Sequence, residues 1–364
     1  MPIDRLDVSV YTIPTEEPEA DGTFAWDSTT VVVVEPEAEG TTGLGFTYGT
    51  GACATLVRDV LAGEVVGRDP MDTMGAWNAM VNAIRNVGRP GIASMAIAAV
   101  DTSLWDLKGR LLGQPVARLL GMVREAVPVY GSGGFTSSSD EELAEQLGAW
   151  VNDLGIPRVK MKVASDRGTQ EERDLRRIWL ARKAIGPDAG LFIDANGGYA
   201  RKQAVRLARA FALEGVTWFE EPVSSDDLEG LREIRDLIDM DVAAGEYGYD
   251  VVYFERMASA GAVDVLQADV SRCAGITEWL RVAAVAAAHG LQVSGHTAQS
   301  LHVHAAAAVP NLRHLEYFHD HARVDRLLFD GVLDPVEGHL LPDLSRPGLG
   351  LDLKRSDAER FRKD

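Results

Sequence analysis

The hydrophobic pattern divides the chain into two parts that differ in the order of their predicted strands and helices. Three strand-like runs come first, at residues 6–13, 29–35 and 43–48. Four helical segments follow, at about residues 53–67, 73–86, 90–112 and 114–120. Gly113 and Pro115 mark the end of the longest of these helices. Strands followed by helices predict an N-terminal α+β module.

From residue 127 onward, short apolar runs alternate with helical stretches. Eight strand-like runs occur, at residues 127–132, 158–163, 191–196, 217–221, 242–246, 263–269, 291–296 and 313–317. Amphipathic segments lie between them, at residues 141–154, 173–185, 202–213, 228–238 and 276–289. This alternation predicts an α/β fold, a TIM-like β/α barrel. An open doubly wound sheet is the alternative, although no Gly-x-Gly-x-x-Gly follows an early strand.

The patterns give three predicted parts: the α+β module over residues 1–125, the barrel over residues 126–335, and a C-terminal segment over residues 336–364 that packs back on the module. Within the first part, residues 15–27 are acidic and turn-rich. A loop of this length is either a lid over a binding site or a disordered surface loop.

Composition narrows the possible partners. The chain has 364 residues, of which 46% are hydrophobic and 25% charged, as in an ordinary soluble globular protein. Asp and Glu outnumber Lys and Arg by 55 to 36, so the net charge of −19 disfavours nucleic acid and anionic membranes as partners. Cys53 and Cys273 are too few for a disulfide framework or a cysteine zinc site. No signal peptide or membrane span is apparent, so we expect a cytoplasmic protein.

Ionisable residues terminate six consecutive predicted strands. They are Asp194, Glu220, Glu246, Asp269, His296 and Glu316. One such residue can be a solvated strand end, but the C-terminal strand ends of a barrel converge on one mouth, where active sites form. Converging carboxylates repel one another unless a cation lies among them. Asp194, Glu220 and Glu246 offer hard oxygen ligands, which suits Mg²⁺, with Mn²⁺ as a plausible replacement; zinc would prefer His or Cys.

Lys160 and Lys162 are two residues apart on one predicted strand, so their side chains share a face. If this face is the barrel interior, burial and the neighbouring positive charge both lower a lysine pKa, and a lysine can then act as a general base. The alternative is a surface strand whose lysines face water.

Asp269 and His296 end adjacent predicted strands. A carboxylate bonded to one imidazole nitrogen orients the ring and raises its basicity. Lys162 and His296 would lie on opposite sides of the mouth, which suits abstraction of a proton next to a substrate carboxylate, with the metal and lysine charge stabilising the enediolate. Glu316 is either a hydrogen-bond donor to that intermediate, if protonated, or a strand-end salt-bridge partner.

Several short motifs, taken together and in order, resemble the mandelate racemase branch of the enolase superfamily. They are Lys160-Met161-Lys162, Asp194-Ala195-Asn196, Phe219-Glu220-Glu221-Pro222, Gly245-Glu246, Gln267-Ala268-Asp269, His296 and His314-Leu315-Glu316-Tyr317. The resemblance implies a capping domain over a (β/α)7β barrel and one Mg²⁺ on Asp194, Glu220 and Glu246. It also implies that Lys162 and the His296–Asp269 pair are acid/base groups, with Lys160 beside Lys162.

The same resemblance implies how substrate is bound. Asn196 would touch substrate, and Glu316 would lie on the side of the substrate carboxylate. Specificity would come from two capping-domain loops, at about residues 15–29 and 47–51, which carry Trp26 and Tyr48. The expected partner is a small carboxylate, either a sugar acid or a 2-hydroxy acid, and the protein is expected to form a homo-oligomer.

Two overall reactions begin with the same removal of the α-proton, and the sequence does not decide between them. We favour an Mg-dependent acid-sugar dehydratase, a lyase, and the alternative is a racemase or epimerase of a 2-hydroxy acid, an isomerase. Phe24 and Trp26 in the predicted lid favour a less polar substrate.

Two other classes of function are weighed against these. A zinc hydrolase is a minor alternative because seven of the eight histidines fall within residues 289–321. His302 and His304, however, are two apart on a predicted helix and point to different sides. A non-catalytic sugar-acid-binding barrel is the other alternative, and it would need no proton-transfer groups on opposing faces.

Overall fold

A computed structural model describes residues 2–363. The N-terminal part is an antiparallel sheet of β1 (Arg5–Ala20), β2 (Ala25–Ala38), β3 (Thr41–Thr42) and β4 (Gly45–Tyr48). Helices α1 (Gly51–Leu56), α2 (Ala62–Val65), α3 (Thr73–Ala83), α4 (Ile92–Leu112) and α5 (Val116–Leu119) follow, with a π-helical turn over Val57–Leu61 between α1 and α2. The predicted order of strands and then helices is therefore found.

The central strand β2 shows why this sheet joins two cores. Val31 and Val33 belong to the hydrophobic cluster that extends into the barrel, whereas Val32 and Val34 belong to the cluster beneath the capping helices. Alternate side chains of a strand point to opposite faces, so a continuous valine run is buried on both sides. Gly45 lets β4 lie directly on α4, since a Cβ at this position would approach the Ser103 backbone nitrogen to 2.3 Å.

Within residues 2–363, eight parallel strands close into a barrel through pairing of the last strand with the first. They are β5 (Val127–Gly133), β6 (Arg158–Lys162), β7 (Gly190–Asp194), β8 (Val216–Glu220), β9 (Asp241–Ala244), β10 (Val265–Ala268), β11 (Gln292–Gly295) and β12 (Leu312–Phe318). This closure confirms the predicted TIM-like barrel with an N-terminal cap and excludes the open doubly wound sheet.

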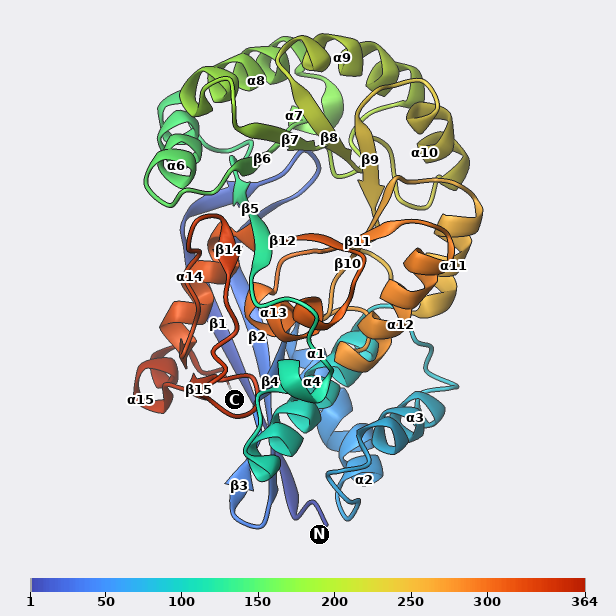
Figure 1. Cartoon of the computed structure of the whole chain (residues 1–364), viewed down its shortest axis with the longest axis vertical. Helices are drawn as coiled ribbons and strands as arrows, with labels where there is room; N and C mark the ends of the chain where they lie inside the picture. Colours follow the sequence, from blue (N-terminus) through green and yellow to red (C-terminus); the bar gives the residue numbers. More distant parts are fainter. Residues whose placement is uncertain (1, 364) are drawn as a thin grey trace.

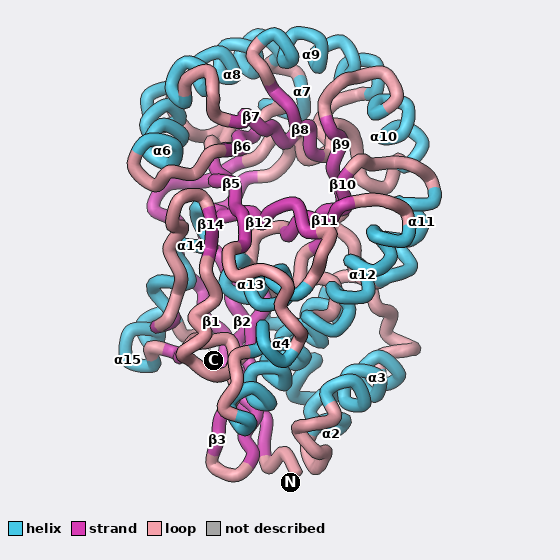
Figure 2. Tube along the Cα trace, viewed as in Figure 1, coloured by secondary structure: helices cyan, strands magenta, loops and turns pink. Residues whose placement is uncertain are grey.

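Helices surround the ring of strands on the outside, as Figures 1 and 2 show. They are α6 (Asp140–Asn152), α7 (Ser165–Gly168), α8 (Glu171–Ile185), α9 (Arg201–Leu213), α10 (Leu228–Arg235), α11 (Val251–Ser259), α12 (Ile276–Ala288) and α13 (Gln299–Ala308). Inside the ring, Tyr130, Phe192, Trp218, Ala243 and Val265 form a small closed cluster. The barrel is thus filled below its mouth, as is usual for this fold.

The expectation of a loop at residues 15–27 is wrong. β1 and β2 continue as a long hairpin, in which Glu19 pairs with Trp26 and Ala20 with Ala25 after a register shift between Pro14 and Glu19. The acidic, turn-rich composition suggested a loop, but Pro14 and Pro18 interrupt the strand ladder without ending it. The hairpin reaches across to the barrel (Figure 1), where the Thr136 backbone N–H donates to the Ala20 carbonyl at 2.8 Å.

The C-terminal segment contacts both parts of the chain. After α14 (His319–Leu328), the short strands β13 (Phe329–Asp330) and β15 (Asp352–Leu353) pair with each other, and β14 (His339–Leu340) pairs with barrel strand β5. α15 (Arg355–Ala358) begins at Arg355, which forms an ion pair with Glu35 of β2, and a 3₁₀ turn over Glu359–Phe361 follows. Because these contacts reach both parts, the boundary at residue 335 stays a prediction.

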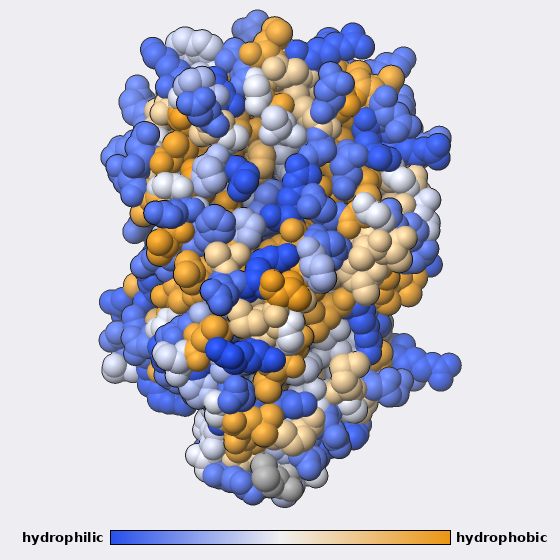
Figure 3. All heavy atoms as spheres, viewed as in Figure 1, coloured by the Kyte–Doolittle hydropathy of each residue, from blue (hydrophilic) through white to orange (hydrophobic). Residues whose placement is uncertain are grey.

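On the face shown in Figure 3, hydrophilic side chains are spread widely, with apolar side chains in scattered groups between them. No helix within residues 2–363 is long and apolar enough to cross a membrane.

Candidate active site

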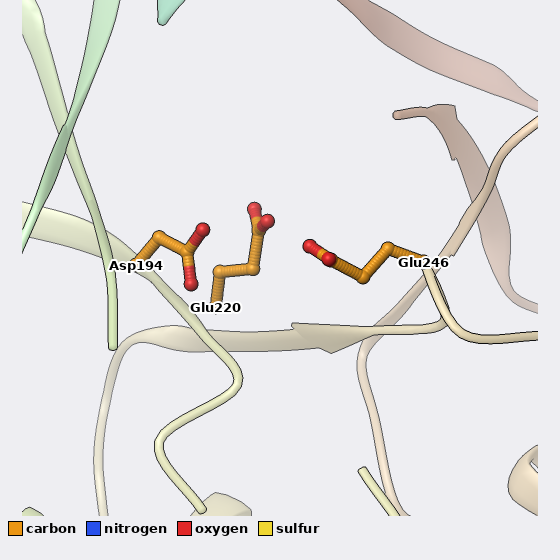
Figure 4. Close-up of side chains that lie close together, drawn as sticks. All are labelled: Asp194, Glu220 and Glu246. Atoms are coloured by element: carbon orange, nitrogen blue, oxygen red, sulfur yellow. The ribbon is translucent and has the colours of Figure 1, made fainter. Parts of the chain in front are cut away.

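Three acidic side chains meet at the mouth of the barrel. In the parallel register, Asp194 of β7 lies beside Glu220 of β8, so their side chains leave the sheet at the same level. Glu246 follows β9 after Gly245, whose φ of +136° and close approach to the Gln267 carbonyl leave no room for a side chain. Each of the three carboxylates offers an oxygen within 4.8 Å of the other two, and all three point toward one another (Figure 4).

The electrostatics of these three carboxylates (the acidic triad) favour a bound cation. All three are buried, with exposures of 0%, 0% and 4% for Asp194, Glu220 and Glu246. Burial and the neighbouring Asp194 charge raise the pKa of Glu220 to about 8. An all-oxygen donor set of this kind fits a hard divalent ion such as Mg²⁺ better than zinc. The predicted ligand residues are thus brought together.

The two lysines of β6 point into the barrel rather than toward water, and Lys160 is fully buried. Its Nζ lies 2.7 Å from Glu220 Oε2 and 2.8 Å from Glu316 Oε1, and Lys162 Nζ contacts Asp194. Burial lowers the pKa of both amines, as expected, but the surrounding carboxylates outweigh it and raise both pKa values above the ordinary range. The expected lowering of the lysine pKa is therefore not found, because carboxylates outnumber the amines.

On the other side of the triad, His296 is held between two acids. Its Nδ1 lies 2.8 Å from Asp269 Oδ2 and its Nε2 lies 3.3 Å from Glu246 Oε2. Asp269 is fixed in turn by the backbone N–H and hydroxyl of Ser271, each at 2.7 Å. Burial lowers the pKa of the imidazole, but Glu246 and the Asp269 bond outweigh it and raise the pKa to about 10. The predicted histidine–aspartate pair is formed.

Glu316 lies between Lys160 and His296. Its Oε2 accepts a 3.0 Å hydrogen bond from the Thr297 backbone N–H and lies 3.8 Å from His296 Nε2. Burial raises the pKa of this carboxyl, but the Lys160 charge outweighs it, and the pKa falls to about 2. Of the two alternatives for Glu316, the structure favours the salt bridge over the protonated donor.

A cavity of about 360 Å³ opens above these groups. Lys162, Asn196, Glu246, His296 and Glu316 line its inner end. The hairpin β1–β2 and the end of β4 contribute most of its cap, including Trp26 and Tyr48.

The two cap aromatics are held by partners the sequence did not reveal. The indole Nε1 of Trp26 donates to Glu19 at 2.9 Å, which orients the ring at the cavity edge. The Tyr48 hydroxyl is bonded to Asp325, and its ring stacks on His321 with centroids 3.4 Å apart. Tyr48 therefore offers the cavity a ring rather than a free hydroxyl.

The cavity also contains residues that the sequence analysis missed. Arg272 lies 3.3 Å from Glu246 Oε1 and 3.4 Å from Asp269 Oδ2, so one guanidinium holds a triad acid and the histidine's partner together. Its position three residues after Asp269 was a usable signal. Asp320 lines the cavity from α14. Asp320 could not be placed from its local sequence.

The histidine-rich region does not form a metal site. His302 accepts from the Val270 backbone N–H at 3.0 Å, and His304 accepts from the Ala117 backbone N–H at 3.2 Å, so both histidines are occupied structurally. In the part of the chain that the structure describes, the acidic triad is the only group of three His, Cys, Asp or Glu side chains close enough to hold an ion. The geometry gives the zinc hydrolase alternative no support.

Comparison with known proteins agrees with this geometry. The N-terminal domain of the mandelate racemase / muconate lactonizing enzyme family matches residues 8–121, and the Enolase C-terminal domain-like family matches residues 142–358. D-galactarolactone cycloisomerase of Agrobacterium fabrum is 32% identical over 95% of both chains.

Solved structures show the same arrangement over the whole chain. A mandelate racemase/muconate lactonizing enzyme-like protein from Rubrobacter xylanophilus has a TM-score of 0.96 and 52% identity, covering 99% of both chains. L-talarate/galactarate dehydratase from Salmonella typhimurium, crystallised with Mg and L-lyxarohydroxamate, has a TM-score of 0.92 and 28% identity, covering all of this chain and 93% of that one. From the capped barrel and these matches together, the chain belongs to the mandelate racemase/muconate lactonizing enzyme family of the enolase superfamily.

Proposed function

We propose that this protein is an Mg²⁺-dependent acid-sugar dehydratase that begins by removing the proton α to the substrate carboxylate. The observation that carries the proposal is that Lys162 and His296 flank the acidic triad, one at Asp194 and the other at Glu246. A substrate bound above the triad would thus meet a proton-transfer group on either side. The relatives that are a dehydratase and a cycloisomerase of sugar acids support the same substrate class.

Asp194, Glu220 and Glu246 would hold the metal ion. When bound, a divalent cation supplies charge that polarises the substrate carboxylate and stabilises the enediolate. The same charge would offset the carboxylates that now raise the pKa of Lys162, and so favour its neutral, basic form.

The chain's own residues account for the proton movements. The Lys162 amine takes the α-proton as the Cα–H bond breaks, and Lys160 adds positive charge beside the developing enediolate. The Cβ–O bond then breaks, and His296, protonated and held by Asp269, gives its proton to the departing hydroxyl, which leaves as water. The resulting enol becomes the keto form. Asn196, at the cavity wall, would contact the substrate near Cα.

The test is exchange of the substrate α-hydrogen in deuterated water, over a panel of sugar acids and 2-hydroxy acids, with Mg²⁺ and with a chelator. We expect Mg²⁺-dependent exchange and a keto-deoxy product, and loss or alteration of exchange in Lys162→Ala and His296→Asn. Absence of exchange with every acid would refute the proposal and favour the non-catalytic binding barrel.

Product analysis in the same experiment distinguishes the dehydratase from a second candidate function, a cycloisomerase. The observation that favours this second candidate is the similarity to the A. fabrum cycloisomerase. A cycloisomerase would pass through the same enediolate but would release an isomer of its substrate instead of a keto-deoxy acid. A mirror-image or epimeric product would instead indicate the racemase predicted as the alternative from the sequence.

We further propose that the substrate is a small carboxylate and that the protein works in the cytoplasm as a homo-oligomer. The net charge of −19 argues against polyanionic partners. Light scattering of the purified protein would measure the oligomeric state, and a monomer at working concentration would contradict it.

A further inference from the structure

The outer end of the active-site cavity is formed by residues that no step of the proposed reaction uses. Trp26 and Thr29 come from the hairpin, and Phe318, Asp320 and His321 from the end of β12 and the start of α14. We call these five residues the outer wall. The substrate carboxylate is drawn to the triad at the inner end, so the far end of a sugar chain would face the outer wall.

The outer wall has no cation that could bind a second carboxylate. Among the described residues lining the cavity, Lys162 and Arg272 are the only lysine and arginine, and both lie against acids of the inner end. Burial lowers the pKa of His321 to about 3, so this imidazole is neutral at physiological pH. A carboxylate placed at this end would lose its water without gaining a counter-ion.

Asp320 adds a carboxylate to the outer wall. It is 1% exposed; its Oδ2 accepts from the Thr29 hydroxyl, and its Oδ1 lies 2.7 Å from the guanidinium of Arg323. Arg323 is not among the residues lining the cavity, and it also donates to the Pro14 carbonyl at 2.9 Å. Asp320 and the aromatic rings thus line the cavity, while Arg323, the cation that pairs with Asp320, lies behind them.

We propose that the site takes sugar acids with a single carboxylate and excludes the corresponding diacids, with Asp320 as a specificity-determining residue; this rests on the proposed function. A terminal hydroxyl can donate to a carboxylate oxygen, and the C–H face of a sugar packs on aromatic rings. A terminal carboxylate can do neither and would repel Asp320. The strongly acidic chain also disfavours a dianion during approach.

A larger neighbouring pocket provides a route by which a diacid could still bind. It has a volume of about 930 Å³, shares Phe24, Asn196 and Tyr247 with the active-site cavity, and contains Arg167 and Arg256. A diacid long enough to pass Asn196 could place its second carboxylate near these guanidinium groups. Arg167→Gln and Arg256→Gln therefore test this route.

The experiment compares matched pairs of aldonates and aldarates that differ only in oxidation of the terminal carbon, by α-hydrogen exchange and dehydration with Mg²⁺. We expect kcat/KM for the best aldonate to exceed that for its aldarate by about 100-fold, since a buried contact between like charges is strongly unfavourable. Equal turnover of both members would overturn the proposal and leave the proposed function intact. No exchange with any acid would overturn the proposed function and this proposal with it.

Variants then locate the cause of the selectivity. Asp320→Asn should raise aldarate activity relative to aldonate activity at least about tenfold. Asp174→Asn is the matched control, because Asp174 is also 1% exposed but does not line the cavity, and the ratio of aldarate to aldonate activity should not change.

An unchanged ratio of aldarate to aldonate activity in a folded Asp320→Asn would overturn the role of Asp320. Aldarate turnover that falls in Arg167→Gln or Arg256→Gln would overturn the exclusion of diacids. If Asp320→Asn does not fold, the wild-type pairs alone decide the substrate class.

Discussion

His296 and Asp269 are joined by a 2.8 Å contact between Nδ1 and Oδ2, and the opposite nitrogen of the imidazole faces Glu246. The two residues end or follow neighbouring strands, β11 and β10, which are in parallel register. The contact therefore fixes both the tautomer and the direction of the ring: Nδ1 is committed to Asp269, and Nε2 is aimed into the cavity.

This contact predicts that Asp269→Asn will slow the reaction without abolishing metal binding. Asparagine keeps the shape of the side chain but removes the charged hydrogen-bond partner that helps to raise the pKa of His296. A smaller fraction of the imidazole is then protonated and able to donate to the departing hydroxyl. We expect kcat to fall by about 100-fold or more, the range typical of losing one acid/base group. The Mg²⁺ affinity, measured calorimetrically, should change little. A kcat close to wild type would show that His296 does not transfer the proton.

Metal removal should lower the stability of the folded protein. The carboxylates of the acidic triad are buried close together, and a bound ion relieves their repulsion only in the folded state. Free Mg²⁺ at about 100 times its dissociation constant should stabilise the protein by about 2.7 kcal/mol, seen as a rise in Tm over the chelator-treated sample.

Two variants make the metal prediction specific. Glu246→Gln should remove most of the Mg²⁺-dependent rise in Tm. Glu278→Gln also alters a fully buried glutamate, but one that pairs with Arg89 and Arg281 away from the triad, and it should keep the rise. If both variants respond to Mg²⁺ like the wild type, the ion binds elsewhere.

The sequence predicted the acidic triad because the C-terminal ends of parallel strands lie at one edge, so residues such as Asp194 and Glu220 must become neighbours. It also predicted that Lys160 and Lys162 share a face. It could not predict their pKa values, because these depend on how many carboxylates surround each amine in three dimensions.

Contacts between distant segments were beyond local patterns. Tyr48 meets Asp325 across 277 residues of sequence, and Thr29 meets Asp320 across 291. The hairpin at residues 15–27 was missed for a related reason: its pairing depends on the opposite strand and on anchoring by Thr136, not on its own acidic, turn-rich composition.

Gly22, at the tip of the hairpin, predicts how the cap closes on the barrel. A Cβ at this position would lie 2.6 Å from the Val163 carbonyl oxygen and 2.7 Å from that of Ala164, which follow β6. Gly22→Ala should therefore push the tip away from the barrel, raising KM by about tenfold through loss of cap contacts worth about 1.4 kcal/mol, with a smaller change in kcat.

Gly63→Ala is the matched control for the hairpin. Gly63 lies in α2, and a Cβ there meets nothing within 4 Å. This change should leave KM unaltered and stabilise the helix by up to about 1 kcal/mol. An unchanged KM in Gly22→Ala would mean that the hairpin tip does not control access to the site.

Asp101 predicts a dependence of stability on pH that is separate from catalysis. It lies in α4, is fully buried, and accepts hydrogen bonds from the backbone N–H and hydroxyl of Thr277 at the start of α12. Burial raises its pKa to about 7, against about 3.9 in an unfolded chain. Its contribution to stability is thus fully present below about pH 4 and is lost as the pH rises through about 7.

Asparagine at this position can still accept from Thr277 but does not titrate. Between about pH 5 and pH 8, the free energy of unfolding of the wild type should therefore fall relative to that of Asp101→Asn by about 2 kcal/mol, measured by urea denaturation. Asp236→Asn, at an exposed position, is the control variant. Asp101 joins a capping helix to a barrel helix. If the difference in free energy of unfolding between the wild type and Asp101→Asn stays constant with pH, the Asp101 carboxyl group is already ionised at pH 5 within this buried contact.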